Sequence, residues 1–489
     1  MPETIELNKM AQARLQSIRK QRIEKVKKLR ELGIDPYPAR CQRKQTNVQA
    51  RKSLGKKVAL AGRVMAMRGH GKICFFDLVD STGKIQLWFQ KENLGKKEYK
   101  ILKYFDIGDF IGVEGKVVET KAGEISVDVG SFQFLSKAIR PLPDKWHGLK
   151  DIEERYRKRY LDLIMNPSVR ATFERKAKFW ELSRKFIKSK GFIEIETPIL
   201  EHKTGGADAR PFITHMNALG QDFYLRISTE LYQKRLIGGG FEKIYTLGPN
   251  FRNEGIDDEH LPEYYQLEWY WAYANYRDNM HLVKQLFLYL ARELYGKTRF
   301  KMGKYDFDLA NKWKEIDYVE IMRKKFSIDV FNSSEKEMLR VIKKHGIQLK
   351  GDISKSRLLD NLWKILRKGI SGPAFLVNEP KFISPLAKSK KEDPRLTERF
   401  HVIIAGRELG NGYSELNDPV DQLERFKEQQ SARDKGDEES QMLDTDFVEM
   451  LEYGMPPTSG YGQSERVFWT FEGISAREGT LFPTLRYKK

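Results

Sequence analysis

Alternating apolar and polar residues mark five short segments between Val58 and Leu135, and this pattern predicts a β-domain. Apolar residues at every second position are typical of strands that bury one face. Turns that contain glycine, such as Ser81-Thr82-Gly83 and Ala122-Gly123, separate the segments. In chain order, the expected strands are VALAGRVMAMR, KICFFDLVDS, GKIQLWFQ, FIGVEGKVVET and EISVDVGSFQFLS. Five strands in so short a stretch favour a small closed barrel, with the oligonucleotide-binding (OB) fold as the leading candidate.

The first three expected strands carry aromatic and hydrogen-bonding side chains among basic residues. These side chains are Arg68, Phe75, Phe76, Gln86 and Trp88. Stacking of a nucleic-acid base on one aromatic ring contributes roughly 1–3 kcal/mol. Alternatively, the aromatic rings simply fill the barrel. The pattern does not separate these two interpretations for any single ring.

Residues 8–33 have the periodicity of a helix. Arginine and lysine fill most positions between the apolar residues Met10, Leu15, Ile18, Ile23, Val26 and Leu29. One interpretation is a solvated helix with one packed face, and the other is a basic helix that lies along an RNA backbone. Gly33, Pro36 and Pro38 would end the helix. Residues 1–54 are therefore expected to form a basic helix and a linker.

The rest of the chain mixes helical and strand patterns, which predicts an α+β fold. A long amphipathic helix is expected to end at Gly191 and to precede a strand, FIEIETP. Residues 300–395 look like an insertion, of which 316–371 is mostly helical and polar. The expected domains are the barrel at 55–140, a linker at 141–155, and a larger domain at 156–489 that contains the insertion.

Within the larger domain, two strands joined by a polar loop are expected up to Tyr276. IYTLGPNF forms the first strand, and the alternation of Tyr265, Leu267, Trp269 and Trp271 indicates the second. The polar residues of this hairpin are Arg252, Glu254, His260, Glu263 and Glu268. A hairpin with an arginine at the end of one strand and carboxylates on the other can hold a phosphate and an ammonium at once.

Composition and charge add limits to this picture. A chain of 489 residues should form about two to four domains. Its two cysteines, Cys41 and Cys74, cannot form a disulfide framework, which favours a reducing compartment. The first residues lack the apolar core of a signal peptide, and no apolar run reaches the roughly 18 residues of a membrane span, so a cytoplasmic protein is expected. The formal net charge of +20 favours a polyanionic partner.

Motifs along nearly the whole chain resemble those of class II lysyl-tRNA synthetases. ETP near Pro198, FRNE at 251–254 with HLPEYYQLE at 260–268, and SGYGQSER at 459–466 with LFPTLR resemble the three motifs of the class. These three motifs also fit aspartyl and asparaginyl enzymes. The closer resemblance to the lysyl members rests on RPLPDKWHGLKD, RYLDLI, GGADARPFITH, ELYQKRLIGGGFEKIY, NGYSELNDP and EYGMPPT.

This resemblance implies a fold, an activity and partners. The fold is an N-terminal OB-fold barrel followed by a catalytic domain with an antiparallel sheet, flanking helices and a helical insertion. The activity is ATP-dependent attachment of L-lysine to tRNA(Lys) through a lysyl-adenylate, by a homodimer whose interface includes the first motif. The first step needs positioning and charge neutralisation rather than a protein nucleophile. The alternative is a tRNA- or RNA-binding paralogue with decayed or altered catalytic activity.

The resemblance assigns the ATP site to residues of the hairpin and the C-terminal region. Arg252 would bridge the lysine carboxylate and the α-phosphate, Tyr264 would stack on adenine, and Arg466 would cap the far end of ATP. Glu254 and His260 belong to the ATP-binding loop. The expected catalytic residues are Arg252, Glu254 and Arg466.

The lysine site is assigned in the same way. Two carboxylates, Glu268 and Glu415, would hold the ε-ammonium, because a desolvated ammonium needs acidic partners. Tyr270 would close this pocket. Glu230 and the backbone of Gly206 would bind the α-amino group, and Asn411 and Tyr413 would line the stem. Arg252 would hold the carboxylate of the substrate.

Mg²⁺ is expected with ATP, because the phosphates need a hard cation with oxygen ligands. Glu408 occupies the position of one carboxylate ligand of the family. His401 stands where the family usually has a second glutamate, and imidazole is a poor Mg²⁺ ligand. His401→Glu is therefore expected to leave activity unchanged or to raise it.

Two more departures from the family concern the nucleotide end of the site. Glu259 stands where lysyl members typically have an arginine that faces the triphosphate, and an acid there is expected to repel it. In SGYGQSER, Ser464 lies near an expected glycine and one residue is missing, which predicts a reshaped pocket.

In the barrel, Arg68, Phe75 and Gln86 match the positions that read the anticodon in the family. The resemblance implies that Phe75 stacks on a base and that Gln86 and Arg68 hydrogen-bond to base edges. The expected target is the U-rich anticodon of lysine tRNA.

Overall fold

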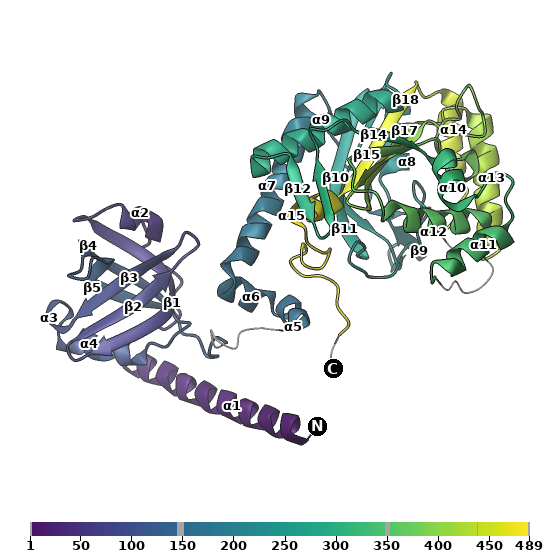
Figure 1. The fold of residues 1–489 in the computed structure, drawn as a ribbon. Helices are drawn as coiled ribbons and strands as arrows, with labels where there is room; N and C mark the ends of the chain where they lie inside the picture. Colours follow the sequence, from purple (N-terminus) through teal and green to yellow (C-terminus); the bar gives the residue numbers. More distant parts are fainter. Residues whose placement is uncertain (1, 144–150, 348–352, 438, 488–489) are drawn as a thin grey trace. The chain divides into compact units, whose positions relative to one another are not determined.

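The computed structural model describes residues 2–143, 151–347, 353–437 and 439–487. The chain divides into two compact units, Met1–Lys150 and Asp151–Lys489 (Figure 1). Residues 144–150, which include part of the expected linker 141–155 and most of RPLPDKWHGLKD, lie outside the described residues. The domain limits expected from the sequence stay a prediction.

The first unit contains the closed barrel that the alternation predicts. Its strands follow the order β1-β2-β3-β5-β4 around the barrel. They are β1 (Lys57–His70), β2 (Ile73–Val79), β3 (Lys84–Gln90), β4 (Phe110–Glu119) and β5 (Ile125–Ser136). Short helices accompany them: α2 (Asn47–Arg51), α3 (Lys91–Leu94), α4 (Lys96–Ile101) and η1 (Leu102–Tyr104). The barrel interior is apolar, and Phe76, Leu87 and Phe89 are fully buried in it.

The basic N-terminal segment forms helix α1 (Pro2–Glu31). In its C-terminal part, Val26 and Leu29 are buried, and Leu29 belongs to the apolar core of the barrel. Arg22 extends this contact by donating hydrogen bonds to the carbonyl oxygens of Ala138 (2.9 Å) and Arg140 (3.1 Å). The expected apolar face does not continue along the whole helix, because Met10 is 69% exposed. The helix extends well beyond the barrel surface that could bury it.

The second unit is built on an eight-stranded sheet with the order β14-β15-β16-β17-β18-β11-β10-β6. The strands are β6 (Ile193–Glu194), β10 (Lys243–Phe251), β11 (Glu263–Ala272), β14 (Lys314–Asp317), β15 (Ala374–Val377), β16 (Arg399–Ile404), β17 (Arg407–Ser414) and β18 (Thr458–Ser464). The pairings from β15 to β10 are antiparallel, as expected. The two outermost pairings, β14 with β15 and β10 with β6, are parallel. The sheet is therefore mixed rather than purely antiparallel.

Strand β11 shows how the sequence separates a core face from a site face. Leu267 and Trp269 belong to a large apolar core on one side of the sheet. Helices α7 (Pro167–Ser189), α9 (Tyr276–Tyr295) and α15 (Arg466–Glu472) cover this side. The alternate residues Glu268 and Tyr270 face the other side, because side chains of a strand point to opposite faces in turn.

A second apolar core lies on that other side of the sheet. It joins Ile244 and Tyr270 to helices α8 (Glu230–Gly238), α13 (Pro419–Asp434) and α14 (Thr445–Tyr453). The remaining elements are α5 (Ile152–Arg157), α6 (Arg159–Met165), η2 (Lys381–Ile383), the three-stranded sheet of β7 (Leu200–Glu201), β8 (Ile213–Met216) and β9 (Gln221–Leu225), and the hairpin of β12 (Arg299–Met302) and β13 (Tyr305–Asp308).

Most of the expected insertion is a helical segment between two neighbouring strands of the main sheet. Helices α10 (Tyr318–Phe326), α11 (Glu335–Lys344) and α12 (Lys355–Arg367) follow β14 and precede β15. They enclose an apolar core of their own, which includes Met322, Met338 and Leu362. Because the segment follows β14 and precedes β15, it is anchored at the edge of the sheet that these two strands form.

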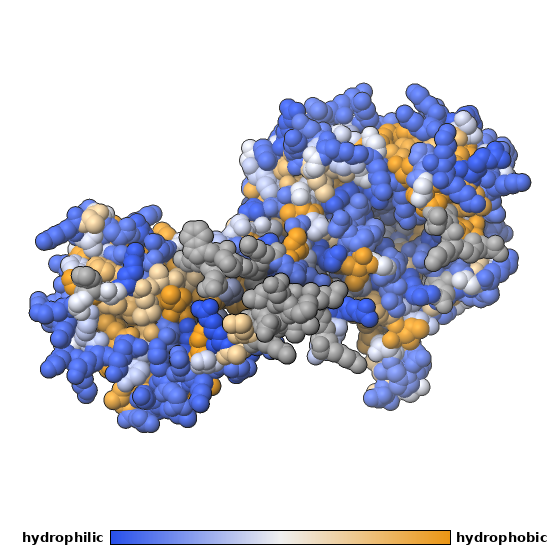
Figure 2. All heavy atoms as spheres, turned by 60° about the horizontal axis from the view of Figure 1, so that its bottom comes forward, coloured by the Kyte–Doolittle hydropathy of each residue, from blue (hydrophilic) through white to orange (hydrophobic). Residues whose placement is uncertain are grey.

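The visible surface is mostly hydrophilic, and its apolar side chains form small groups (Figure 2). Among the described residues, no helix has the length and apolar character needed to cross a membrane.

Candidate active site

A cavity of about 580 Å³ lies in the second unit, on the side of the sheet that carries Glu268 and Tyr270. It brings together segments from the whole unit. Every residue that the sequence assigned to ATP, lysine or metal binding lines this cavity: Gly206, Glu230, Arg252, Glu254, His260, Tyr264, Glu268, Tyr270, His401, Glu408, Asn411, Tyr413, Glu415 and Arg466.

At one end of the cavity, the carboxylate of Glu268 is buried among neutral donors. It accepts hydrogen bonds from Tyr270 Oη (2.8 Å), Thr229 Oγ1 (2.9 Å) and Gln266 Nε2 (2.9 Å). Burial raises the pKa of Glu268, and the nearby Glu230 raises it further. None of these three donors carries a charge. The site can therefore attract a cation.

The same end holds a second group of charged residues. Tyr413 Oη donates a 2.5 Å hydrogen bond to Glu230 Oε1. Lys234 Nζ lies 2.5 Å from the same oxygen and also forms an ion pair with Glu415. The sequence assignment did not include Lys234. The sequence did contain a signal for this ion pair, because Lys234 follows Glu230 by four residues on a predicted helix, a spacing that brings two side chains together.

Two glycines of β18 keep this end of the cavity open. Gly460 pairs with Tyr270 and Tyr413 on the neighbouring strands, and a Cβ there would lie 2.5 Å from Glu415 Oε1. A Cβ at Gly462 would lie 2.7 Å from Gln266 Nε2. Real Cβ atoms do not approach other atoms so closely. Any side chain at these positions would therefore displace the carboxylates or their donors.

At the other end of the cavity, arginine side chains dominate. Arg252 follows the last residue of β10, and its guanidinium lies 5.5 Å from the centre of the Tyr264 ring. Arg466 donates hydrogen bonds to the carbonyl oxygens of Glu408 (2.8 Å) and Glu259 (3.3 Å). Burial and the charge of Arg466 lower the pKa of His260. This end can hold an anion.

Glu259 does not leave an unbalanced negative charge at this end. Its carboxylate lies 3.3 Å from the guanidinium of Arg367 on α12 and 3.6 Å from that of Arg407 on β17. The expected repulsion of a triphosphate by Glu259 is therefore offset by two arginines that sequence reasoning missed. They are far from Glu259 in the chain, and no local pattern connects them.

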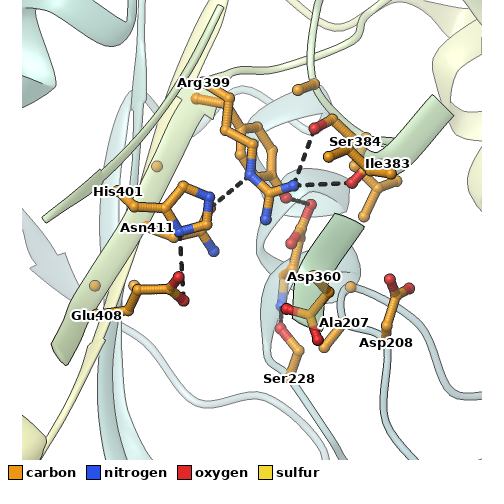
Figure 3. Close-up of a pocket in the computed structure, with 18 of the residues that line it drawn as sticks. Ala207, Asp208, Ser228, Asp360, Ile383, Ser384, Arg399, His401, Glu408 and Asn411 are labelled. Atoms are coloured by element: carbon orange, nitrogen blue, oxygen red, sulfur yellow. Dashed lines mark hydrogen bonds and ion pairs between the residues drawn. The ribbon is translucent and has the colours of Figure 1, made fainter. Parts of the chain in front are cut away.

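Figure 3 shows His401 directed at Glu408 in one corner of the cavity. His401 Nε2 lies 3.1 Å from Glu379 Oε1, and His401 Nδ1 lies 3.8 Å from Glu408 Oε2. Glu408 Oε1 also accepts a hydrogen bond from Trp363 Nε1. Burial alone would raise the pKa of Glu379, but His401 and Arg399 hold it at about 2.

This corner fits a Mg²⁺ ion only in part. Glu408 offers carboxylate oxygens, which suit a hard cation. Both nitrogens of His401 face carboxylates instead, so His401 does not fit as a metal ligand. In the part of the chain that the structure describes, no group of three or more histidine, cysteine, aspartate or glutamate side chains is arranged to hold a metal.

Arg399 links this corner to the lysine end (Figure 3). It donates hydrogen bonds to Asn411 Oδ1 (3.2 Å), the Ile383 carbonyl oxygen (3.1 Å) and Ser384 Oγ (3.0 Å). Its guanidinium lies 5.8 Å from the centre of the Tyr413 ring. Arg399 is therefore a further cavity residue that the sequence assignment missed.

In the first unit, the three residues assigned to anticodon reading share the outer face of the barrel. Arg68 on β1 pairs with Phe75 on β2, and Phe75 pairs with Trp88 on β3. The rings of Phe75 and Trp88 are stacked, with centres 6.2 Å apart. Gln86 accepts a hydrogen bond from Ser126 Oγ (2.9 Å), while Arg68 is 62% exposed and pairs with Asp77. Phe76 points inward and belongs to the barrel core.

Comparisons with known proteins agree with this arrangement. Residues 151–486 match the family model described as tRNA synthetases class II (D, K and N), and residues 58–135 match an OB-fold nucleic acid binding domain. A lysine–tRNA ligase of Thermotoga maritima is 43% identical over 488 residues, which cover 97% of each chain. The chain belongs to the lysine–tRNA ligase family of class II synthetases. It is also 43% identical to the lysine–tRNA ligases of Thermosipho melanesiensis (97% of each chain) and Bacillus subtilis (96% of this chain, 97% of the relative).

Membership of the lysine–tRNA ligases confirms the fold and the activity expected from the motifs. An OB-fold domain precedes a class II catalytic domain, and the activity of the family is that of a lysine–tRNA ligase.

Proposed function

We propose that this protein activates L-lysine with ATP and transfers it from a lysyl-adenylate to tRNA(Lys). The observation that carries this proposal is the division of the cavity. One end holds the buried carboxylates Glu230, Glu268 and Glu415, and the other holds Arg252 and Arg466. A substrate with ammonium groups and a polyphosphate can therefore lie in one continuous cavity.

In this proposal, the lysine end selects its substrate by charge. The ε-ammonium binds between Glu268 and Glu415, and Tyr270 closes the pocket. Glu230 and the backbone of Gly206 receive the α-amino group, while Asn411 and Tyr413 line the stem. A neutral analogue of lysine would leave buried carboxylates without partners, which costs binding free energy.

The ATP end supplies positioning and positive charge. Arg252 bridges the lysine carboxylate and the α-phosphate, because a guanidinium can bond two anions at once. Tyr264 stacks on adenine, Glu254 and His260 contact the nucleotide, and Arg466 caps the phosphates. Holding two anions in line lowers the barrier without a protein nucleophile.

Mg²⁺ enters this proposal as the ion that accompanies ATP and neutralises its phosphates. Glu408 is the residue that would hold it. His401 is left out of the metal site, because its ring nitrogens face Glu379 and Glu408.

The barrel is proposed to recognise the anticodon of tRNA(Lys). Phe75 and its neighbour Trp88 offer a stacking surface, and Arg68 and Gln86 flank it with hydrogen-bonding groups. Single-stranded bases are commonly read by this combination of stacking and edge contacts.

We further propose that the protein is a homodimer and acts in the cytoplasm, where protein synthesis consumes its product. Several large apolar side chains around the first motif are exposed: Ile193, Ile199, Leu200, Ile213 and Leu219. A second copy of the chain would cover such residues. Analytical ultracentrifugation of the wild type and of Ile213→Glu tests this, and a monomeric wild type would refute it.

Lysine-dependent ATP–pyrophosphate exchange tests the proposed reaction. We expect exchange that requires both L-lysine and Mg²⁺, followed by charging of tRNA(Lys). If no exchange occurs at saturating Mg²⁺ while tRNA still binds, the protein is an RNA-binding paralogue instead.

A further inference from the structure

Lys234 places a fully buried ammonium group inside the lysine end of the cavity. Its side chain is 0% exposed and lies on α8. The ammonium pairs with Glu230 (2.5 Å) on the same helix and with Glu415 beyond β17. The rings of Tyr413 (5.4 Å) and Phe447 (5.8 Å) enclose it. The ammonium is therefore held by two carboxylates and two aromatic rings of the protein.

The charges at this end are unequal. This end holds three buried carboxylates, Glu230, Glu268 and Glu415, and one buried ammonium group, Lys234, which pairs with the first and the last of them. When all are ionised, two negative charges remain. Free lysine carries two ammonium groups, and its carboxylate is assigned to Arg252. The charge left by Lys234 therefore equals the charge that the substrate brings.

Lys234 acts against protonation of Glu415. Burial, Glu230 and Glu268 hold the pKa of Glu415 well above its usual range, and Lys234 lowers it without cancelling that rise. Burial lowers the pKa of Lys234, but Glu230 and Glu415 outweigh this and keep the ammonium charged. Like charges that share a desolvated site cannot all ionise.

The other groups around Lys234, Glu230 and Glu415 are tyrosine hydroxyls and arginines that are bonded elsewhere. Arg226 interacts with Glu268, but its guanidinium donates hydrogen bonds to the carbonyl oxygens of Pro249 (2.8 Å) and Thr197 (3.0 Å). Tyr270 and Tyr413 face Glu415, and burial raises the pKa of both hydroxyls, so they stay neutral. Arg399 lies behind the Tyr413 ring, 5.8 Å from its centre. Its hydrogen bonds go to Asn411, Ile383 and Ser384.

We propose that Lys234 is the internal counter-ion of the lysine pocket, which offsets one of its three buried carboxylates and leaves two for the two ammonium groups of lysine. This inference rests on the proposed function. Lys234 is a positioning residue that acts through Glu230 and Glu415. A purely structural salt bridge would stabilise the fold but would not link lysine binding to protons.

The test is Lys234→Met, which keeps the length of the side chain and removes its charge. Calorimetric titration with L-lysine at pH 7, in buffers of different ionisation enthalpy, measures the protons exchanged on binding. We expect the variant to release more protons per lysine than the wild type, by up to about one, because a protonated carboxyl group must ionise to bind an ammonium. The lysine KM should rise by at least about tenfold and fall as pH rises, while the ATP KM stays within about twofold.

Two further variants sharpen this test. The double variant Lys234→Met with Glu415→Gln removes both members of this ion pair. Its proton release should return to the wild-type value or below, although lysine binding stays weak. Lys243→Met is the matched control, because Lys243 packs on the Trp271 ring (4.8 Å) and lies outside the cavity. It should show wild-type proton exchange.

Three results would overturn the inference. The first is a folded Lys234→Met that releases no more protons on lysine binding than the wild type does. The second is an unchanged lysine KM in that variant. The third is an unfolded Lys234→Met that Glu415→Gln does not rescue. A wild type without lysine-dependent exchange would instead refute the proposed function.

Discussion

The carboxylate of Glu259 lies 3.3 Å from the guanidinium of Arg367, although the two residues are far apart in the chain. Glu259 belongs to the loop between β10 and β11, and Arg367 is the last residue of α12. Arg367 also donates a 2.6 Å hydrogen bond to the carbonyl oxygen of Gly406. The pair thus connects the helical segment to the nucleotide end of the cavity and balances an acid that would otherwise face phosphates.

Glu259→Gln tests this pair. The variant leaves the nearly buried Arg367 and Arg407 without their carboxylate, which is expected to destabilise the fold by about 2 kcal/mol. We expect a lower melting temperature. The charge-reversed double variant Glu259→Arg with Arg367→Glu should recover most of the loss, whereas Glu259→Arg alone should be the least stable. Additive effects in this cycle would contradict a direct pairing.

Glu415→Gln tests the selection of lysine by charge. Loss of one charged partner of the ε-ammonium should raise the lysine KM by roughly 10- to 100-fold, because such hydrogen bonds contribute about 1.5–3 kcal/mol. The ATP KM should change far less, as measured by pyrophosphate exchange. The control is Glu263→Gln, an exposed residue of the same sheet. Equal effects on both KM values would rule out the assigned role.

His401→Glu has a different expected result once the structure is known. The sequence favoured unchanged or higher activity, because glutamate is common there in the family. In the fold, the new carboxylate would face Glu379 and Glu408, and three like charges would repel one another. We expect a raised ATP KM and lower stability in the single variant. Adding Glu379→Gln should recover both, and failure to do so would exclude this repulsion as the cause.

Phe75→Ala tests the anticodon surface. The loss of one stacking ring should lower kcat/KM for tRNA(Lys) by roughly 5- to 150-fold, which corresponds to 1–3 kcal/mol. Lysine-dependent pyrophosphate exchange should stay unchanged, because that step needs no tRNA. Charging assays and exchange assays on the same preparation measure both. A parallel decrease in exchange would indicate general damage instead of lost recognition.

Glu201→Gln tests a pH effect on stability. Burial raises the pKa of Glu201 to about 8, from 4.5 in an unfolded chain. Between pH 4.5 and about pH 8, Glu201 keeps its proton in the folded state and loses it in the unfolded state. The free energy of unfolding therefore falls as pH rises, by roughly 1.4 kcal/mol per unit. The variant should melt with a weaker pH dependence from pH 5 to 8 and be more stable than the wild type at pH 8. An unchanged slope would contradict the protonated state.

Much of the fold could be predicted from the sequence because its signals are local. The alternation in β1 to β5 and in β11 reflects which side chains each strand buries, and neighbouring residues carry that information. The motifs around Arg252 and Arg466 likewise identified the family and the residues of the cavity. The two parallel edge pairings were missed, because the partner of an edge strand is not encoded in its own alternation.

The sequence by itself determined the two kinds of domain, the class of enzyme and the acidic and basic residues of the site. Only the tertiary structure decided how those charges are balanced. It placed Arg367 and Arg407 against Glu259, Glu379 against His401, and Lys234 between Glu230 and Glu415. The physical reason is that a Coulomb interaction depends on distance in space and on burial. Neither quantity can be derived from spacing along the chain when the partners lie on different elements.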